Sequence, residues 1–517
     1  MTPHACHGRG TKRGAMHLAL AVLVCVPSVV LAAGCAGPLR FPTEPLRVTD
    51  ASAGKRLAYD TDGAGRADYV ARANEAGRIT HVGYAPAGGE PDAFVDLDGV
   101  PAEQCRHVVL VLDGVGYETV RAFREAGHLR LFHPPARVIS TFPSMTDIAL
   151  ADAFQSVRPI GYEARYFDPA RNRMAGGDGD YLAMVNEDWV RCTDYRAPAL
   201  VDPLSYLFPQ HYFKEELKAL VSLIERRDRP MVVAYLVSTA GMGTMHMAEG
   251  QQEILRAVDR LTHQLVWGSR GLVKVTLFSD HGHQLVPARW IDFRAFLRER
   301  GWEVTERIDE PEDVVVIDYG LVTYASFATR DRAGLAEDLL DHEGVDVVTY
   351  TANGSVVVRS DEGRARLEQR GPRYRYVPET GDPLHLAAVV ERATAEGLLD
   401  ADGFADGRTW LRLTVRHEYP DAVVRLWRAF HGITEHVPDV IASLKDGYSA
   451  GLPSRAARFP EGASTHGDLA AKSSTAFVMS TAGPIPDAAR PLRSRDLPKV
   501  LPGLLGRPWP PTRKETP

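Results

Sequence analysis

The sequence has little cysteine. Five cysteines occur among 517 residues, and three of them, the last being Cys35, lie within the first 35 positions. Only Cys105 and Cys192 follow, so one disulfide is allowed in an oxidising compartment, and the sequence leaves open whether it forms. So few thiols also exclude a zinc cluster built from cysteine.

Positive charge is also scarce. The chain has 60 Lys and Arg against 67 Asp and Glu, a formal net charge of −7. Without residues 1–34, which hold three basic and no acidic side chains, the balance is 57 against 67 and the formal charge is −10. No nucleic acid is expected to bind as a bulk polyanion, because such binding depends on Lys and Arg that neutralise phosphates.

The apolar stretch near the N-terminus is too short to span a membrane. It runs from Ala15 to Leu31 after three basic residues and falls short of the ~20 residues that a spanning helix needs. Small residues then lead directly into Cys35. Segment 1–34 therefore resembles a lipoprotein signal peptide, with Cys35 acylated as the first mature residue, which predicts an exported protein anchored to a membrane of the bacterial cell envelope. The alternative is an ordinary secretory signal in which Cys35 is incidental.

The remaining 483 residues are enough for one large α/β domain with an insertion. Residues 35–103 are rich in Gly, Ala, Pro and Asp and predict a small β-rich extension. The core is expected in two parts, 104–289 and 461–517. Between them, residues 290–460 are expected to form an α+β insertion or cap. This part includes Asn353-Gly354 between two β-branched runs, which is typical of a hairpin.

Four short apolar runs predict the central sheet. The first, from His107 to Leu112, is rich in β-branched residues, as in a buried strand of a parallel sheet. Three later runs repeat the pattern: Met231 to Val237, Lys274 to Phe278 and Ala476 to Met479. Between the second and third runs, apolar residues fall at helical spacing: Ile254, Leu255, Val258, Leu261 and Leu265. The sequence therefore predicts an α/β fold, a three-layer αβα sandwich.

Metal-ligand side chains follow two of these runs. Asp113 comes directly after the first run, and Asp280 and His281 come after the third. In open α/β sheets, ligands gather at the carboxyl ends of strands. An Asp-Gly pair alone is more often a turn and a lone histidine is more often structural, but together they indicate a metal site. Two further segments carry Thr141, before a helix-like run, and His466, before the last strand.

The order of these segments resembles the alkaline phosphatase superfamily, in particular its type I phosphodiesterase/nucleotide pyrophosphatase-like branch. The resemblance covers about residues 105–285 and 445–485. It implies activity on small phosphoester substrates and a divalent metal ion, zinc or manganese, held by four residues: Asp113, Thr141, Asp280 and His281. It also implies that His466 binds a second ion together with an Asp and a His from the middle strand.

The residue types suit phosphoryl transfer on physical grounds. A threonine hydroxyl is a poor nucleophile at neutral pH, and coordination to a divalent cation lowers its pKa and aligns it for in-line attack. Thr141 would then form a phosphothreonine intermediate that water cleaves. Ser140 and Ser144 could do the same chemistry if the register is shifted. Alternatively, Thr141 simply begins a helix after a strand.

The middle strand departs from the family pattern. Family members carry Asp-x-x-Gly-His there, whereas the stretch 235–246 contains no acidic residue. The place of the Asp is taken by Ser238, Thr239 or Ala240. His246 supplies the imidazole only if a small insertion displaces it. With fewer anionic ligands, the second position should hold a cation weakly, use water ligands or stay empty.

Two functions follow from this pattern. The first is a metal-dependent hydrolase of phosphoric esters that uses Thr141 and one tight metal site. The second is a catalytically impaired protein of the same fold that acts as an envelope binding module, which the missing carboxylate favours. A sulfatase is disfavoured because the string of Cys or Ser, x, Pro, x and Arg does not surround Thr141. The sequence does not distinguish nucleotide, lipid and glycan substrates.

Overall fold

The computed structural model describes residues 39–52, 54–86, 88–226, 229–459 and 462–512. All of these residues belong to one compact unit. The predicted signal segment 1–34 and the predicted acylation site Cys35 lie outside the described residues. Within the described ranges, none of the helices combines the length and the hydropathy that a bilayer-spanning segment requires.

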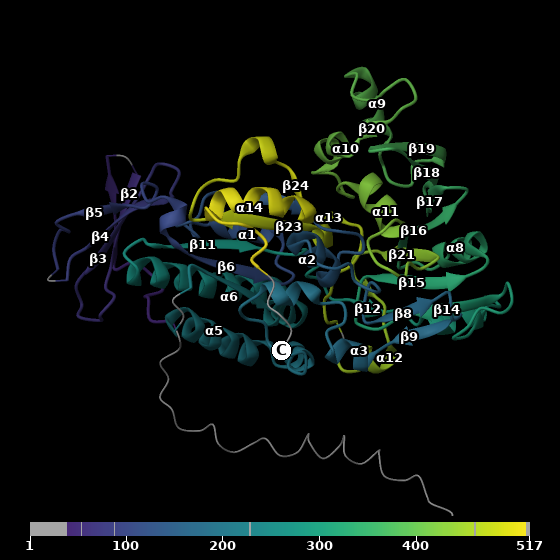
Figure 1. Ribbon diagram of the computed structural model, residues 1–517, viewed down its shortest axis with the longest axis horizontal. Helices are drawn as coiled ribbons and strands as arrows, with labels where there is room; N and C mark the ends of the chain where they lie inside the picture. Colours follow the sequence, from purple (N-terminus) through teal and green to yellow (C-terminus); the bar gives the residue numbers. More distant parts are fainter. Residues whose placement is uncertain (1–38, 53, 87, 227–228, 460–461, 513–517) are drawn as a thin grey trace, which may run out of the picture. The chain divides into compact units, whose positions relative to one another are not determined.

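The core of the fold is a six-stranded mixed sheet (Figure 1). In spatial order its strands are β10 (Met231–Leu236), β6 (Arg106–Leu112), β11 (Val273–Phe278), β23 (Thr475–Ser480), β7 (Ala136–Ile139) and β24 (Leu492–Arg493). All four strands predicted from the apolar runs lie in it. The prediction of a parallel sheet is wrong for β23, which is antiparallel to both of its neighbours, β11 and β7. The chain enters β23 at the edge of the sheet where the parallel strands end. The strand β23 therefore runs in the opposite direction to them.

Helices cover both faces of this sheet. Along β6, Val108, Leu110 and Leu112 join one apolar cluster and Val109 and Val111 join another, as expected for a strand buried on both sides. The helices of the first face are α1 (Tyr117–Glu125), α5 (Pro209–Arg226) and α6 (Ser238–Gly268), and those of the second are α2 (Thr146–Phe154) and α14 (Leu497–Leu505). The layers are therefore α, β and α around a mixed sheet.

The helix predicted between the second and third strands is confirmed as α6. Its four residues Ile254, Leu255, Val258 and Leu261 are fully buried in the first cluster. The helix is interrupted at Met247, whose φ of 48° and ψ of −129° are not helical. The interruption separates a first segment, next to the end of β10, from the long amphipathic part.

A second sheet precedes the core. It is an antiparallel meander of β1 (Arg47–Ala51), β2 (Gly54–Tyr59), β3 (Tyr69–Ala73), β4 (Ile79–Tyr84) and β5 (Phe94–Asp96). It occupies the range for which a β-rich extension is predicted. Tyr69 and Val82 are fully buried and belong to the same apolar cluster as α6. The meander thus shares its core with the central domain.

Both cysteines beyond Cys35 are buried. Cys105 directly precedes β6, and burial raises the pKa of its thiol. Cys192 lies on the other face, in the cluster that contains α2. Among the described residues, the two are not joined in a disulfide.

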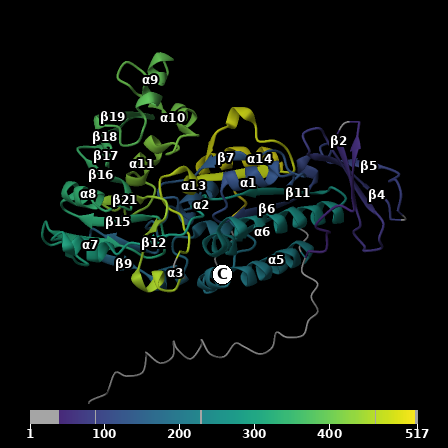
Figure 2. The ribbon, with the colours of Figure 1, turned by 180° about the vertical axis from the view of Figure 1, so that it is seen from behind.

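The insertion contains a nine-stranded sheet (Figures 1 and 2). Its order is β13 (Glu303–Val304), β14 (Asp313–Ile317), β15 (Tyr324–Thr329), β21 (Val440–Leu444), β16 (Val345–Ala352), β17 (Ser355–Ser360), β18 (Gly363–Arg370), β19 (Arg373–Gly381) and β20 (Ala405–Asp406). The predicted hairpin is confirmed between β16 and β17. Asn353 and Gly354 have φ of 50° and 74°, as a type I′ turn requires.

Shorter elements complete the fold. The helices of the insertion are α7 (Phe293–Glu299), α8 (Arg332–Leu340), α9 (Ala387–Ala395), α10 (Gly407–Thr414) and α11 (Ala422–Phe430). Elsewhere lie α3 (Asp178–Leu182), α4 (Asp202–Leu207), α12 (Pro453–Ala456) and α13 (Ala471–Ser474). Two ribbons pair β8 (Arg165–Asp168) with β9 (Arg173–Gly176) and β12 (Arg289–Trp290) with β22 (Tyr448–Ser449).

Candidate active site

Three predicted ligands meet at the carboxyl edge of the central sheet. Asp113 directly follows β6, and Asp280 and His281 follow the neighbouring parallel strand β11. Because both strands end at the same edge, the three side chains converge. A carboxylate oxygen of each Asp and one ring nitrogen of His281 all lie within 4.8 Å of one another, and all three residues are buried. Such a group can hold a metal ion.

Each of the two carboxylates has one oxygen fixed and one oxygen free. Asp113 Oδ2 accepts a hydrogen bond from the Tyr235 hydroxyl at 2.5 Å. Asp280 Oδ1 accepts from the backbone N–H groups of Gly114 and His281, at 3.1 and 2.9 Å. In the described part of the chain, the other two oxygens, Asp113 Oδ1 and Asp280 Oδ2, are buried without a hydrogen bond. Buried carboxylate oxygens are normally satisfied, so this pair is suited to face a cation.

The ring of His281 is oriented in the same way. Its Nδ1–H donates to the carbonyl oxygen of Gly282 at 2.8 Å, which leaves the lone pair on Nε2. Nε2 lies 3.2 Å from Asp280 Oδ2 and 3.6 Å from Asp113 Oδ1. A larger residue at Gly282 would disturb this turn, because an added Cβ would lie 1.9 Å from the carbonyl oxygen of Lys472. Three atoms with lone pairs thus face one small volume.

The charges in this volume favour a bound cation. Burial raises the pKa of Asp113 and of Asp280, and the charge of Asp280 raises that of Asp113 further. Burial lowers the pKa of His281 to about 4, so its ring is neutral at pH 7. A divalent cation would stabilise the ionised carboxylates and requires a neutral imidazole. The donor set fits zinc or manganese.

The hydroxyl beside this group belongs to Thr146, which the sequence analysis missed. Thr146 is the first residue of α2, and its Oγ1 lies 3.1 Å from His281 Nε2. Thr141, the predicted nucleophile, has its hydroxyl bonded to the carbonyl oxygen of Pro143 at 2.8 Å. Of these two hydroxyls, the one hydrogen-bonded to the metal-ligand group is therefore that of Thr146.

The two serines considered with Thr141 are buried on the same segment. Ser144 Oγ donates to the carbonyl oxygens of Thr141 and Asp468, each at 3.1 Å. Ser140 Oγ has no hydrogen bond among the described residues. Neither serine is hydrogen-bonded to the metal-ligand group, so neither replaces Thr146 in this geometry.

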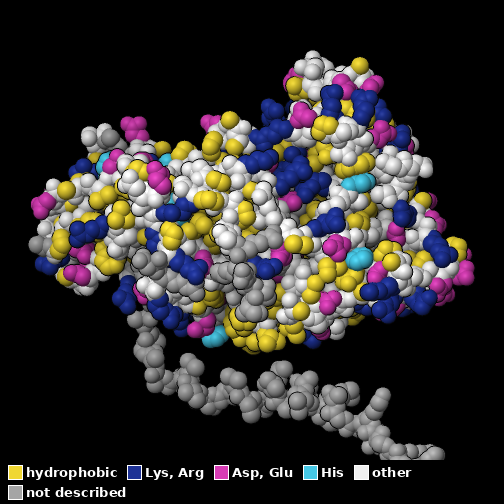
Figure 3. Space-filling view, in the orientation of Figure 1, with side chains coloured by type: hydrophobic (Ala, Val, Ile, Leu, Met, Phe, Trp, Pro, Cys, Tyr) yellow, Lys and Arg dark blue, Asp and Glu magenta, His cyan; other side chains and the backbone are white. Residues whose placement is uncertain are grey.

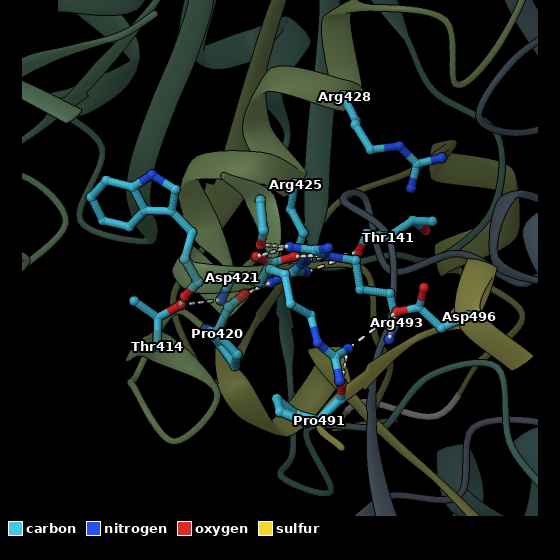
Figure 4. Close-up of polar contacts among 12 residues, drawn as sticks. Thr141, Thr414, Pro420, Asp421, Arg425, Arg428, Pro491, Arg493 and Asp496 are labelled. Carbon is cyan, nitrogen blue, oxygen red and sulfur yellow. Dashed lines mark hydrogen bonds and ion pairs between the residues drawn. The ribbon is translucent and has the colours of Figure 1, made fainter. Parts of the chain in front are cut away.

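The segment that carries Thr141 is anchored by Arg425 of α11 (Figure 4). The buried Arg425 guanidinium donates to the carbonyl oxygen of Thr141 at 2.9 Å, to Ser144 Oγ at 3.1 Å and to the carbonyl oxygen of Leu469 at 3.0 Å. Burial lowers the pKa of Arg425 to about 10. One side chain of the insertion thus holds both loops that approach the site, and Thr141 contributes its backbone to this arrangement.

His466 lies directly against His281. The two rings are stacked, with centroids 3.8 Å apart and an interplanar angle of 22°. Nδ1–H of His466 donates to the carbonyl oxygen of Ser144 at 2.9 Å, so Nε2 carries the lone pair. Burial lowers the pKa of His466 to about 3, and the ring is therefore neutral. His466 precedes β23, and the reversed direction of that strand brings it to this edge of the sheet.

The middle strand ends in hydroxyl and methyl groups. The Thr239 hydroxyl donates to the carbonyl oxygen of Asp113 at 2.8 Å. Ala240 is buried next to it. The Thr244 hydroxyl lies 3.3 Å from His283 Nε2, which shows that His283 is engaged within the protein. This side of the site has two imidazoles nearby but, in the described first turns of α6, no carboxylate.

His246, the other predicted ligand, is not in the group that Asp113, Asp280 and His281 form. His246 is exposed on α6, next to the interruption at Met247. Because α6 begins at Ser238, Thr244 faces the interior, with 3% of its surface exposed. Residues two positions apart point to nearly opposite sides of a helix, so His246 points away.

A cavity of about 240 Å³ opens on the site. Its lining includes Thr146 and His466. The wall also contains a buried ion-pair network in which Arg196 contacts Glu187 and Asp202, each at 2.7 Å. Burial raises the pKa of Glu187 to about 8. Many other wall residues are aromatic: Tyr162, Tyr181, Trp189, Tyr206, Tyr319 and Phe459.

Comparisons with known proteins find similarity at the level of structure. No family model matches the sequence, and no curated protein matches it. Phosphonoacetate hydrolase from Sinorhizobium meliloti 1021, in complex with phosphonoformate, is similar with 12% identity and a TM-score of 0.41, over 78% of this chain and 95% of that chain. An inactive murine ectonucleotide pyrophosphatase/phosphodiesterase 5 in complex with AMP is similar with 12% identity and a TM-score of 0.40, over 80% and 97%. At such values, the chemistry of this chain has to be inferred from its own residues.

Proposed function

We propose that this chain is a metal-dependent hydrolase of phosphoric esters, of the nucleotide pyrophosphatase-like branch of the alkaline phosphatase superfamily. One observation carries the proposal. The free oxygens of Asp113 and Asp280 and the free nitrogen of His281 converge, and the Thr146 hydroxyl lies 3.1 Å from that nitrogen. A buried pair of carboxylates is destabilising without a cation, which supports a functional reason for this arrangement.

Each residue of the site has its own role in phosphoryl transfer. A divalent cation held by Asp113, Asp280 and His281 would supply Lewis-acid stabilisation and lower the pKa of a hydroxyl beside it. Thr146 Oγ1 gives up its proton and attacks the phosphorus, the ester bond to the leaving oxygen breaks, that oxygen takes up a proton to become the alcohol, and a phosphothreonine forms. Water then cleaves the phosphothreonine, and His466 Nε2 can accept a hydrogen bond from that water. Tyr235 holds Asp113 in place throughout.

We propose one tight metal position rather than two. Asp113, Asp280 and His281 fit the first position, whereas the first turns of α6 supply Thr239, Ala240 and Thr244 where a second ion would need a carboxylate. The same observation favours the alternative function, a catalytically impaired envelope binding module. The two functions make different predictions for Thr146: the hydrolase would carry a phosphate on it during turnover, and the binding module would not.

The N-terminal segment supports a cellular location. We propose that the chain is exported and anchored in the cell envelope by a lipid on Cys35, because basic, apolar and small residues precede that cysteine in the order of a lipoprotein signal. Mass spectrometry of the mature N-terminus tests this. An unmodified residue other than Cys35 at that end would rule it out.

Substitution of the two threonines tests the catalytic proposal. The chain is loaded with zinc or manganese and assayed on phosphomonoesters and phosphodiesters, and quenched samples are searched for phosphothreonine by mass spectrometry. Thr146→Ala should abolish both turnover and the phosphothreonine, Thr146→Ser should retain part of the activity, and Thr141→Ala is the matched control. Turnover that survives Thr146→Ala but not Thr141→Ala would reinstate Thr141. Metal binding without any turnover in the unsubstituted chain would favour the binding module.

A further inference from the structure

Exposed apolar side chains are concentrated in one stretch of the chain. Of the 12 large hydrophobic residues that are exposed in the described part of the chain, seven lie between residues 182 and 208. They are Leu182, Met184, Val185, Leu200, Leu204, Leu207 and Phe208, and we refer to them as the apolar rim. Single exposed hydrophobic residues are common, but a contiguous group marks an interaction surface.

Part of the rim lies at the active-site cavity. Three of its members, Met184, Val185 and Leu207, are exposed to solvent and also line the cavity that contains Thr146. The apolar surface is therefore continuous with the path to the proposed nucleophile. In Figure 3 hydrophobic side chains gather along the lower edge of the molecule, in the region between α5 and α3 of Figure 1.

The short helix α4 carries part of this rim on its exposed side. A surface helix normally turns its apolar side inward. In α4 the polar residues Asp202 and Ser205 face the interior, with 3% and 0% of their surface exposed, whereas Leu204 and Leu207 are exposed and Phe208 follows at 60%. The buried ion pair of Asp202 with Arg196 and the hydrogen bond that Asp202 accepts from the Tyr181 hydroxyl at 3.0 Å hold the helix in this orientation. The outward apolar side is thus fixed by buried polar contacts.

Two arginine side chains lie at the same cavity. Arg455 and Arg458, on and just after α12, both line the cavity, and Arg458 is exposed. Arg455 packs over the Tyr319 ring, 4.2 Å from its centroid, and is paired with Asp178 at 2.5 Å, so Arg458 is the arginine that is exposed at the opening. An apolar rim beside cationic and aromatic side chains matches the boundary between the acyl chains and the phosphate groups of a lipid surface.

We propose that the substrate is an amphiphilic phosphoester, a phospholipid presented at a lipid surface. This rests on the proposed function of the same cavity. The acyl chains contact the apolar rim while the phosphate reaches Thr146. Hydrolysis consumes one water molecule, breaks one phosphorus–oxygen ester bond and releases an alcohol and a phosphate or phosphate ester. A lipid anchor at Cys35, only four positions before Leu39, would hold the folded part close to such a surface.

Paired substitutions test this on the full chain. The rim variant is Leu200→Ser/Phe208→Ser, whose side chains are 72% and 60% exposed and lie outside the cavity lining. The matched control is Leu272→Ser/Leu398→Ser, at 52% and 41% exposed and outside the rim. Turnover is measured on dioleoylphosphatidylcholine vesicles and on the soluble diester bis(p-nitrophenyl) phosphate. The rim variant should lose about tenfold or more on vesicles and little on the soluble diester, and the control should keep both.

A second measurement separates this inference from the proposed function. Hydrogen exchange of the backbone amides of residues 199–208, apart from Pro203, should slow when the vesicles are added to the unsubstituted chain, whether or not any ester is hydrolysed. Slowed exchange without turnover on either substrate would refute the hydrolase and retain the lipid surface. Equal vesicle turnover by the rim variant, or unchanged exchange, would overturn the lipid surface. Exchange that slows only with rising protein concentration would also overturn it, because the rim would then join copies of the chain.

Discussion

The two sides of the site are unequally equipped. The ends of β6 and β11 carry Asp113, Asp280 and His281, each held by a hydrogen bond that leaves one ligand atom free. The end of β10 carries Thr239 and Ala240, which need no cation. Buried carboxylates without a partner destabilise a fold, whereas hydroxyl and methyl groups do not. The side that carries Asp113, Asp280 and His281, the complete side, is therefore maintained at a cost in stability that Thr239 and Ala240 do not add on the other side.

Removal of one ligand from the complete side should have the largest effect. Asp280→Asn keeps an acceptor for the N–H groups of Gly114 and His281 but loses the charge. We expect the tight metal to be lost and turnover to fall by about 10³-fold. Metal analysis of the purified protein and an assay on a soluble diester check this, with Asp180→Asn, another carboxyl that lines the cavity, as the control. Full metal content in Asp280→Asn would show that the ion is held elsewhere.

Loss of Arg425 should have the next largest effect, because its guanidinium holds the two loops, at Thr141 and Leu469, that approach the site. Arg425→Met removes the buried guanidinium that donates to the carbonyl oxygens of Thr141, Leu469 and Pro420, and only the first two keep a hydroxyl donor, from Ser144 and Ser474, among the described residues. We expect the free energy of unfolding to fall by about 3 kcal/mol. Denaturant unfolding checks this against Arg428→Met on the same helix, which breaks a half-buried pair with Asp152. Equal losses of unfolding free energy in the two variants would mean that the Arg425 contacts stabilise the fold no more than the pair of Arg428 and Asp152 does.

On the other side, a buried carboxyl should make stability depend on pH. Glu216 of α5 accepts a hydrogen bond from the Ser238 N–H at 3.0 Å, and burial raises its pKa from 4.5 to about 7. A raised pKa favours folding while the carboxyl is protonated, so this contribution is present below about pH 4.5 and is lost as the pH rises through about 7. Between pH 5 and 8, with metal chelated, unfolding free energy should fall by roughly 2 kcal/mol less in Glu216→Gln than in the unsubstituted chain. The exposed neighbour Glu215→Gln is the control; identical pH slopes in all three proteins would refute the assignment.

The smallest effect on activity is expected from adding the ligands that the end of β10 lacks. Ala240→Asp/Thr244→His adds a carboxylate and an imidazole near His466 Nε2, and should raise the metal content from about one to about two ions per chain. Activity should rise by no more than about tenfold, since the nucleophile and its ion are already present. Thr244→His alone is the control. If the double variant still binds one ion, the inequality between the sides depends on more than their ligands.

Much of the fold follows from local patterns. The strands β6, β10, β11 and β23 were predictable because strands buried on both faces have continuous apolar runs. The direction of β23 was not predictable, since a continuous apolar run looks the same for a strand that runs either way. The hairpin at Asn353 was predictable because Asn-Gly suits the positive φ angles of its turn.

The site residues that follow directly after strands were predictable. Those whose position depends on where a helix begins were not. Asp113, Asp280 and His281 lie as predicted next to one another. Thr146 was missed because its position depends on where α2 begins, and helix boundaries are poorly defined by sequence. A hydroxyl in the first turn of an apolar helix was the available signal. His246 is not in the group of Asp113, Asp280 and His281 for a related reason, because the start of α6 at Ser238 turns Thr244 inward instead.

The reversed strand β23 has a consequence for the biosynthesis of the protein. It is the strand that joins β11, which leads to Asp280 and His281, to β7, which leads to Thr146. A nascent or proteolysed chain that ends before residue 475 would therefore contain every ligand of the tight metal position yet lack the strand that seats the nucleophile beside it. Such a fragment could sequester an ion but could not turn over an ester. The proposed reactivity is thus withheld until ribosomal synthesis has delivered nearly the whole polypeptide.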